Sequence, residues 1–339
     1  MPAADPSLPS NPAPDPDAHG RRRRKTALRL AIALAILAAL LWWADPGSVL
    51  EELANSDLRL LPLILALVIS DRYLMAYKWA LLLRAKGIPI SNGRAFYLYL
   101  VAGFAGLFLP AGVGGDAVRL VHTSVSVRNS GGVAATIMME RLLGMLALTV
   151  VASLALAFLV VEGNKQFQLF FALAAATTIA TLAALWLSTH PLAAAAIDPL
   201  LRRHRRFRIS QALSDCVRDY QSLGRSKALL GKFFAWSLIE RLLPVLATYA
   251  CGLALGLEIH FVYFLAITPI IALLSMIPVT IGGFGLAEAL FVALFALAGL
   301  SASEALALAL YARATELLGL SPGAALLLRS LYIRRSDSR

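Results

Sequence analysis

Charged side chains of opposite sign occur close together inside several apolar segments of this chain. At membrane depth one such side chain costs at least about 2.5–3.5 kcal/mol, so it needs a partner or a hydrated cavity. Neighbouring residues on a helix point about 100° apart, which disfavours pairing with each other. We therefore expect each acid to meet an arginine on another helix, where the planar guanidinium group also suits phosphate. The groups are Asp71-Arg72, Glu140-Arg141, Glu240-Arg241 and Arg313 with Glu316.

A purely structural role is the alternative for these pairs. Asp71 precedes Lys78, and Lys232 precedes Glu240, by only two helical turns, which corresponds to about 10–12 Å along a helix. Both lysines belong to basic clusters that we expect near the cytoplasmic surface. In this alternative the pairs hold helices together close to that surface and bind no ligand.

Two turns rich in proline and glycine also interrupt the apolar sequence, LPAGVGGDAVRL (109–120) and IPVTIGGFGLAE (277–288). In lipid, non-helical backbone survives only where protein or trapped water surrounds it. Such a turn exposes backbone N–H groups at the start of a helix, which favours anion binding. Arg119 lies one helical turn beyond Asp116, so the two could pair or flank a phosphate. Alternatively, the glycines only let helices pack closely.

The composition predicts a membrane protein with several spans. Of the 339 residues, 59% are hydrophobic and 15% charged. The uncharged run 167–189 is long enough to cross a hydrocarbon core of about 30 Å. Apolar runs of this kind recur along the chain, so the predicted fold class is an all-α, polytopic membrane helix bundle.

The net charge of +11 resides mainly in flanks and loops, as in 21–25, 202–208 and 329–335. Basic loops of membrane proteins lie in the cytoplasm, so this pattern is a topology signal. No aromatic-rich basic domain is present that could bind bases, which excludes nucleic acid as a partner. The segment 202–223 could lie along the anionic inner leaflet, and an ordinary cytoplasmic loop is equally compatible with it.

The basic segments predict both termini in the cytoplasm. They also predict that residues 95–128 enter from the cytoplasm, turn at the first glycines and return. This gives about eight transmembrane helices plus a re-entrant hairpin. If 260–300 turns back as well, there are six crossings and two hairpins. Five aromatic residues are predicted to anchor helices at the membrane interface: Tyr73, Tyr77, Trp79, Tyr97 and Tyr99.

The chain divides into a disordered cytoplasmic tail at 1–25 and one transmembrane domain at 26–333. That domain has a first half at about 58–161, a basic cytoplasmic loop at about 190–231 and a second half at about 232–330. The Pro-x-x-Val-Gly-Gly segment of the first turn matches Pro-x-x-Ile-Gly-Gly in the second. The predicted topology makes the two segments enter from opposite sides, which predicts an inverted repeat of the kind common in transporters.

No catalytic constellation is present in the sequence. The five histidines are scattered without metal-ligand spacing, and the two cysteines, Cys216 and Cys251, form no disulfide framework. The glycine segment at 112–119 also lacks the spacing of a nucleotide fingerprint. We therefore expect no catalytic residue, no metal and no cofactor.

Several motifs together resemble the lysylphosphatidylglycerol synthase transmembrane-region family of flippase-like domain proteins. They are DRYLMAYKWALLLRAKGIPI, AGFAGLFLPAGVGGDAVRL, MMERLLG and IPVTIGGFGLAEA. The similarity covers about 27–330 and implies a lipid-transporting membrane region. The family's synthase joins this region to a soluble aminoacyl-transferase domain, for which the chain up to Arg339 has no room, so the resemblance implies no synthase activity. Motif positions shared with the family include Trp79, Pro110 and Gly285.

The preferred hypothesis is a flippase that moves a phosphate-containing lipid between leaflets of a bacterial inner membrane. The lipid is a phospholipid, an aminoacyl-phospholipid or an isoprenoid-phosphate-linked lipid. Asp116, Glu140 or Glu240 could carry a coupling proton. The alternatives are an enzyme that modifies lipid head groups, with Glu140 or Asp116 as base, and an accessory subunit of a cell-envelope pathway.

An anionic membrane lipid is the predicted partner. A homo-oligomer and a complex with a lipid-biosynthesis enzyme are the protein assemblies that the sequence leaves open. The predicted substrate-binding residues combine the charged pairs with the two glycine turns. They are Arg72, Gly114, Gly115, Asp116, Arg119, Glu140, Arg141, Glu240, Arg241, Gly282, Gly283 and Glu288.

Overall fold

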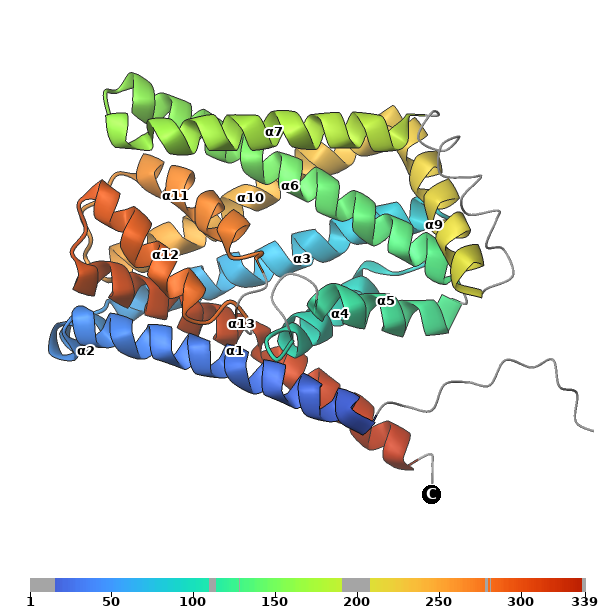
Figure 1. Cartoon of the computed structure of the whole chain (residues 1–339), viewed down its shortest axis with the longest axis horizontal. Helices are drawn as coiled ribbons and strands as arrows, with labels where there is room; N and C mark the ends of the chain where they lie inside the picture. Colours follow the sequence, from blue (N-terminus) through green and yellow to red (C-terminus); the bar gives the residue numbers. More distant parts are fainter. Residues whose placement is uncertain are drawn as a thin grey trace, which may run out of the picture.

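The protein is a bundle of long antiparallel helices, seen in a computed structural model (Figure 1). The structure describes residues 16–109, 114–127, 129–190, 208–277, 280 and 282–336. The predicted all-α membrane helix bundle is confirmed. Its helices are α1 (Pro16–Trp43), α2 (Pro46–Ala54), α3 (Leu61–Ala85), α4 (Asn92–Gly106), α5 (Gly114–Val127), α6 (Ser130–Val161), α7 (Gln168–Thr189), α9 (Arg208–Arg225), α10 (Lys227–Ala254), α11 (Phe261–Leu274), α12 (Leu286–Phe295) and α13 (Ala302–Ser336), with short 3-10 turns at Leu58–Leu60, Lys165–Phe167 and Ala296–Ala298.

Three of the described helical segments are long and apolar enough to cross a membrane by length and composition alone. They are Leu58–Ala85, Ser130–Val161 and Lys165–Thr189. A bent pair, Leu30–Trp43 with Pro46–Ala54, passes the same test as one broken span with an 86° bend. Helices α10 and α13 are also long, at 28 and 35 residues, although charged side chains lower their hydropathy.

Local sequence signals place the helix boundaries. The side chain of Ser91 accepts a hydrogen bond from the Arg94 N–H and caps α4. The side chain of Asn129 does the same for α6 through the Gly132 N–H, at 2.8 Å. Helix α1 begins at Pro16, so residues 16–25 are helical rather than part of a disordered tail. Residues 1–15 lie outside the described part of the chain.

The first predicted hairpin is present. Helix α4 starts beside the end of α3, where Arg84 donates a hydrogen bond to Asn92. Helix α5 then runs back to that same end of the bundle. Helix α6 starts there and packs against α9. Helices α11 and α12 form a second hairpin at the opposite end of the bundle (Figure 1). With 14 and 10 residues they are only about 21 and 15 Å long. These lengths favour the six-crossing alternative over eight crossings.

The two halves of the chain pack in matching ways. Helix α3 lies antiparallel to α10, and the Asp57 N–H at the start of one donates to the Ala254 carbonyl at the end of the other at 2.7 Å. Helix α6 packs on α11 of the second half, as α13 packs on α4 of the first. Each hairpin also contacts the long helix that follows it, α5 with α6 and α12 with α13. This exchange of partners is what an inverted repeat predicts.

The predicted basic loop at 190–231 contains a packed helix, α9. Residues 191–207 lie outside the described part of the chain. Tyr220 and Leu223 of α9 are buried in a cluster with Met139 and Phe233. Because this apolar face is covered by protein, it is not available to lie on a lipid surface.

Candidate functional site

The glycines of the two turns bring the backbones of the hairpins together. A Cβ on Gly115 would lie 3.2 Å from the Ala102 carbonyl oxygen, so the start of α5 packs directly on α4. Gly282 has φ of 60°, and a Cβ there would lie 2.7 Å from the Leu107 carbonyl oxygen. At Gly115 the close-packing alternative holds. At Gly282 the backbone conformation also requires glycine. Pro110 and Pro278 of the two motifs lie outside the described residues.

The two broken turns meet in the middle of the bundle. The Gly282 N–H donates to the Leu109 carbonyl oxygen at 3.4 Å, which joins the tip of the second hairpin to that of the first. On the far side of the second turn, the Gly285 N–H donates to Glu288 Oε2 at 2.6 Å. Glu288 thus caps the start of α12 within the region where the hairpins meet.

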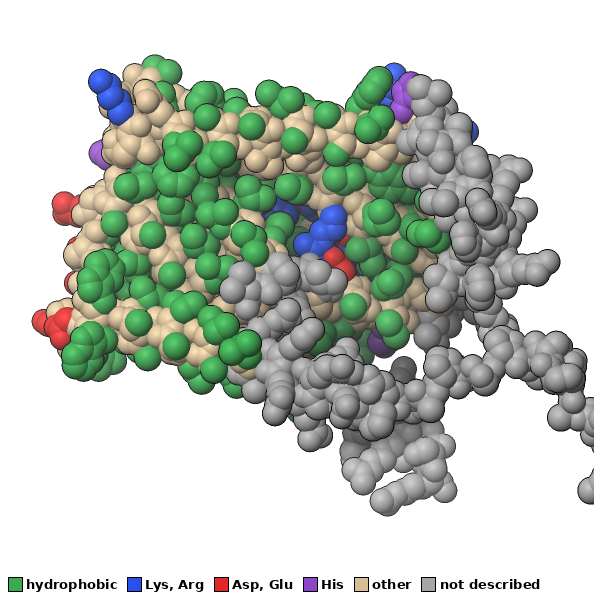
Figure 2. Space-filling view, viewed as in Figure 1, with side chains coloured by type: hydrophobic (Ala, Val, Ile, Leu, Met, Phe, Trp, Pro, Cys, Tyr) green, Lys and Arg blue, Asp and Glu red, His purple; other side chains and the backbone are tan. Residues whose placement is uncertain are grey.

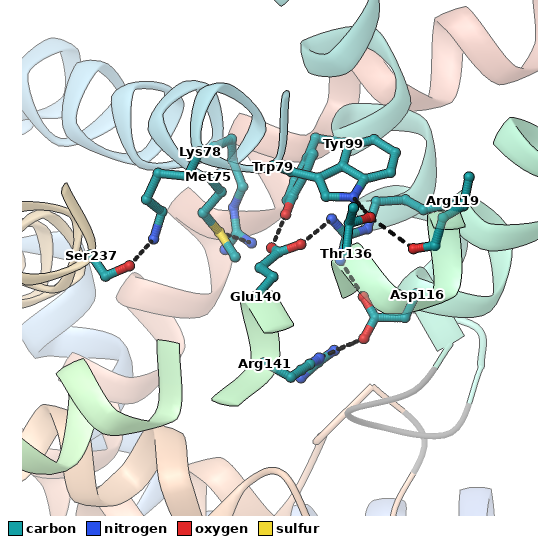
Figure 3. A network of polar contacts seen from close by, with 12 residues as sticks. Met75, Lys78, Trp79, Tyr99, Asp116, Arg119, Thr136, Glu140, Arg141 and Ser237 are labelled. Atoms are coloured by element: carbon teal, nitrogen blue, oxygen red, sulfur yellow. Dashed lines mark hydrogen bonds and ion pairs between the residues drawn. The ribbon is translucent and has the colours of Figure 1, made fainter. Parts of the chain in front are cut away.

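A network of buried charges lies beside the first hairpin (Figure 3). Arg119 of α5 donates through Nη1 to Glu140 of α6 at 2.9 Å and through Nη2 to Asp116. Asp116 also pairs with Arg141 Nη2 at 2.5 Å. Tyr99 donates its hydroxyl hydrogen to the other oxygen of Glu140. Each carboxylate therefore has two polar partners.

Aromatic rings fix the Arg119 guanidinium group in place. Its central carbon lies 4.2 Å from the ring centre of Tyr99 and 4.9 Å from that of Trp79. Such cation–π contacts stabilise a desolvated arginine. Trp79 is fully buried and Tyr99 is 6% exposed, so the prediction that both anchor helices at the membrane interface was wrong. The spacing of aromatic residues does not distinguish a ring in lipid from one that stacks on a buried cation.

Helices α3 and α10, which pack against each other, carry a second set of pairs. Lys78 is 2% exposed and donates to Glu240 Oε2 at 2.8 Å and to Ser237 at 3.0 Å. The expected cross-helix partner of Glu240 was an arginine, and the structure shows this lysine. Lys78 follows Asp71 by two helical turns, which puts both on one face of α3, and this spacing indicates the shared face without indicating the partner on α10.

Helix α13 supplies the remaining partners. Arg72 of α3 donates to Glu316 at 3.2 Å. Arg313 donates to Glu288 of α12 at 3.0 Å and to Glu316 at 3.3 Å. The first half places an arginine on its hairpin against a glutamate of α6. The second half reverses this order, with a glutamate on its hairpin against an arginine of α13.

The adjacent pairs behave differently from the cross-helix pairs. Arg72 Nε lies 3.5 Å from Asp71, and Arg241 Nε lies 3.3 Å from Glu240. Both Nε atoms are buried without a hydrogen-bond partner, so these contacts lack hydrogen-bond geometry. The expectation that neighbours on one helix pair poorly is confirmed at both places. Asp71 is the exception to cross-helix pairing with arginine, since among the described residues its ion pair is with Arg72.

Two cavities lie where these groups meet. The smaller has a volume of about 220 Å³ and lies against α3, α5, α6 and α10. The structure places five cationic side chains and two carboxylates among its lining residues, a formal excess of three positive charges. They are Arg72, Lys78, Arg119, Arg141, Arg241, Asp116 and Glu140.

The larger cavity has a volume of about 450 Å³ and extends between the two hairpins toward α10, α11 and α13. Its charged lining residues balance, with three arginines and three acids among the residues described: Arg72, Arg141, Arg313, Asp71, Glu288 and Glu316. Arg72, Arg141 and Gly115 line both cavities. The two therefore adjoin and differ in charge.

The site opens to one side of the bundle. Arg141 has a side chain that is 44% exposed, whereas that of Arg119 is 5% exposed. Figure 2 shows basic and acidic side chains in a hollow at the middle of a face that is otherwise hydrophobic. A polar group can thus reach the cavities from the side while the surface around it stays apolar.

The structure gathers almost all of the predicted binding residues. Every one of them except Glu240 lines at least one cavity. Glu240 is 1% exposed and lies behind the cavity wall, bonded to Lys78. Sequence reasoning missed Lys78, Tyr99, Thr268 and Ser275 as members of the site.

Comparison with known proteins identifies the family of the chain. A family model described as the lysylphosphatidylglycerol synthase TM region matches residues 30–323. The chain belongs to that family. The UPF0104 membrane protein PH1989 of Pyrococcus horikoshii is similar over 289 residues, with 23% identity, and the match covers 78% of this chain and 85% of the relative. Family membership confirms the resemblance of the motifs and points to a membrane protein with a lipid-related function.

Proposed function

We propose that the protein is a lipid transporter that moves a phosphate-containing lipid between the two leaflets of a membrane. The observation that carries this proposal is the smaller cavity. Five cationic side chains and two carboxylates line it within the described part of the chain, at the depth where two opposed hairpins meet. Cationic side chains outnumber carboxylates among the described groups that face this cavity, which favours an anionic ligand, and a planar guanidinium group suits phosphate oxygens.

Arg241 offers a hydrogen-bond donor to a phosphate. Its side chain is 16% exposed and lies 3.3 Å from Glu240, which also bonds to Lys78. Its Nε has no hydrogen-bond partner. A buried donor without a partner costs about 1–3 kcal/mol, and more when it is charged. A phosphate oxygen in the smaller cavity would remove this penalty.

The sideways opening suits a lipid. A head group that enters beside Arg141 can reach both cavities while its tails stay against the surrounding apolar surface. Exposed apolar side chains such as Leu154, Phe158, Leu173 and Ile179 cover α6 and α7, as expected for helices that face lipid. The head group would then cross within protein and the tails within the bilayer.

We further propose a multi-pass arrangement in a bacterial inner membrane with both termini in the cytoplasm. Six helices cross in this arrangement. The end of the bundle that carries α9 is cytoplasmic, because basic residues are abundant in cytoplasmic loops. Acidic side chains mark the opposite end in Figure 2. The crossing helices are α1, α3, α6, α7, α10 and α13.

Transport is tested by reconstituting the full chain in vesicles and following leaflet exchange of head-group-labelled phospholipids. We expect exchange faster than in empty vesicles for at least one anionic phospholipid, and slower exchange for Arg241→Gln. Rates equal to those of empty vesicles for every lipid would reject transport. Incubation with lipid in detergent, where there are no leaflets, checks for a modified head group, and a product there would favour an enzyme instead.

A further inference from the structure

Four buried polar atoms lack hydrogen-bond partners on described residues that line the larger cavity. They are Arg72 Nε, Asp71 Oδ1, Thr268 Oγ1 and Ser275 Oγ. Asp71 is 6% exposed, and its other carboxylate oxygen, Oδ2, lies 3.5 Å from Arg72 Nε. Buried polar atoms in native proteins almost always bond to protein, water or ligand. Their gathering around one cavity therefore indicates an occupant with hydrogen-bonding groups.

The hydroxyl groups of Thr268 and Ser275 differ from the serine and threonine hydroxyl groups of this protein that donate to their own helix, as do those of Thr123, Ser124 and Thr280. Hydroxyl side chains on membrane helices commonly donate to a carbonyl three or four residues earlier. Thr181 donates in this way to Thr177 at 2.7 Å, and Thr248 donates to Pro244 at 2.9 Å. Thr268 and Ser275 make no such bond. Their hydrogen-bonding capacity is thus left for a group in the cavity.

The two hydroxyl-bearing residues lie on one face of α11 and its C-terminal end, and this face lines the larger cavity. Thr268 and Ser275 are two helical turns apart, with Ile271 and Ala272 between them, and all four line the cavity. A spacing of three, four and seven residues defines one helix face. The same stripe therefore presents two hydroxyl groups along about 10 Å of the cavity wall. Asp71 faces the cavity from α3.

The larger cavity is lined by equal numbers of arginines and acids among the described residues, so it does not favour a charged ligand as the smaller cavity does. Each carboxylate of the larger cavity contacts an arginine: Asp71 with Arg72, Glu316 with Arg72 and Arg313, and Glu288 with Arg313. An ammonium group would have to compete with these arginines for the carboxylates. An uncharged hydroxyl group need not compete, because it can donate to Asp71 Oδ1 and exchange hydrogen bonds with Thr268 and Ser275.

We propose that the larger cavity binds the uncharged, hydroxyl-bearing part of a lipid head group, such as a glycerol or sugar moiety, next to the phosphate held at Arg241. This inference rests on the proposed transport function and specifies its substrate class. Thr268 and Ser275 then determine specificity for the head group, and Arg241 determines affinity for phosphate.

The test measures lipid binding to the full chain by native mass spectrometry. The protein in detergent is mixed with equal amounts of phosphatidic acid, phosphatidylglycerol and phosphatidylethanolamine that carry identical tails. We expect phosphatidylglycerol to bind about tenfold more tightly than phosphatidic acid, the value of one or two additional hydrogen bonds. The variant that combines Thr268→Val and Ser275→Ala should lose this preference and still bind phosphatidic acid as before. Thr181→Val, on α7, is the matched control and should keep the preference.

The outcomes separate the two proposals. Equal binding of phosphatidic acid and phosphatidylglycerol to the natural chain, or a preference that survives in the Thr268/Ser275 variant, overturns the hydroxyl subsite and leaves transport standing. Tightest binding of phosphatidylethanolamine also overturns it, in favour of an ammonium group near Asp71. Binding of none of the three lipids, or binding of all three unaffected by Arg241→Gln, overturns the phosphate site and this inference with it.

Discussion

The guanidinium group of Arg241 on α10 lies against Gly144 on α6, where a Cβ would be 3.5 Å from Nη2. Arg72, on the matching helix of the other half, reaches the carboxylate of Glu316 instead. The first half thus offers a glycine where Arg241 approaches, and the second half offers an acid where Arg72 approaches. Among the described residues, the ion pair of Arg241 is consequently with Glu240 on its own helix, and its side chain lines the smaller cavity.

Arg241→Gln should lower the affinity for an anionic lipid at least about tenfold and leave thermal stability unchanged or slightly higher. The loss of affinity follows from losing a charge-assisted hydrogen bond of about 1.5–3 kcal/mol. Stability is preserved because Arg241 Nε makes no hydrogen bond and Glu240 keeps its hydrogen bond to Lys78. Lipid binding and the unfolding midpoint in detergent check the two expectations together. A large drop in stability would identify Arg241 as a structural residue.

Arg119→Gln should behave in the opposite way. It leaves Glu140 and Asp116 buried with one partner fewer, and breaking a buried pair costs about 3–5 kcal/mol. We expect a clear fall in the unfolding midpoint and in the yield of folded protein. Arg218→Gln on α9, whose side chain is 75% exposed, is the matched control and should leave both unchanged. Equal stability of the Arg119 and Arg218 variants would contradict the network shown in Figure 3.

Lys78→Met should destabilise the contact between α3 and α10. Glu240 loses its 2.8 Å partner and keeps the poorly oriented Arg241. We expect the single substitution to lower the free energy of unfolding by about 3–5 kcal/mol. The loss should be smaller when Glu240→Gln is added, because the second change removes the unpaired buried charge. A double-mutant cycle on unfolding midpoints measures this coupling. Additive losses would show that the two side chains do not interact.

Gly282→Ala should loosen the contact between the hairpin tips. The substitution places a Cβ 2.7 Å from the Leu107 carbonyl oxygen at a φ of 60°. Strain of this kind costs about 1–3 kcal/mol. Gly93→Ala at the start of α4 is the control, because a Cβ there meets nothing within 4 Å. Hydrogen exchange of the 282–295 backbone should accelerate only in the first variant. Unchanged exchange in both would contradict the contact between the tips.

The proposed topology predicts which ends of the bundle a membrane-impermeant thiol reagent reaches. Lys165→Cys lies in the turn between α6 and α7, and Lys227→Cys lies at the start of α10. The native Cys216 and Cys251 are buried and should react slowly. In intact cells we expect labelling at position 165 alone, and labelling at 227 only after the membrane is permeabilised. The reverse pattern would invert the assignment of the termini.

The sequence contained the fold class and the first hairpin, because long apolar runs and the distribution of basic residues report on the membrane directly. It also indicated the cavity-lining glycines and arginines through their poor fit to lipid. It did not indicate the partners of those charges. Lys78 belongs to a basic cluster like those expected near the cytoplasm, and only the packing of α3 on α10 places it against Glu240. The sequence also did not indicate that the hydroxyl groups of Thr268 and Ser275 lack partners, because such groups commonly bond to a carbonyl of their own helix.

The reversed order of charges in the two halves has a consequence for direction. A head group that comes from the side of α4 and α5 first meets a hairpin with both a basic and an acidic residue, Arg119 and Asp116. A head group that comes from the side of α11 and α12 meets Glu288, which is already paired with Arg313 at 3.0 Å. Under the proposed function, the same backbone plan would therefore set different rates of capture for an anionic head group that arrives from one leaflet and from the other.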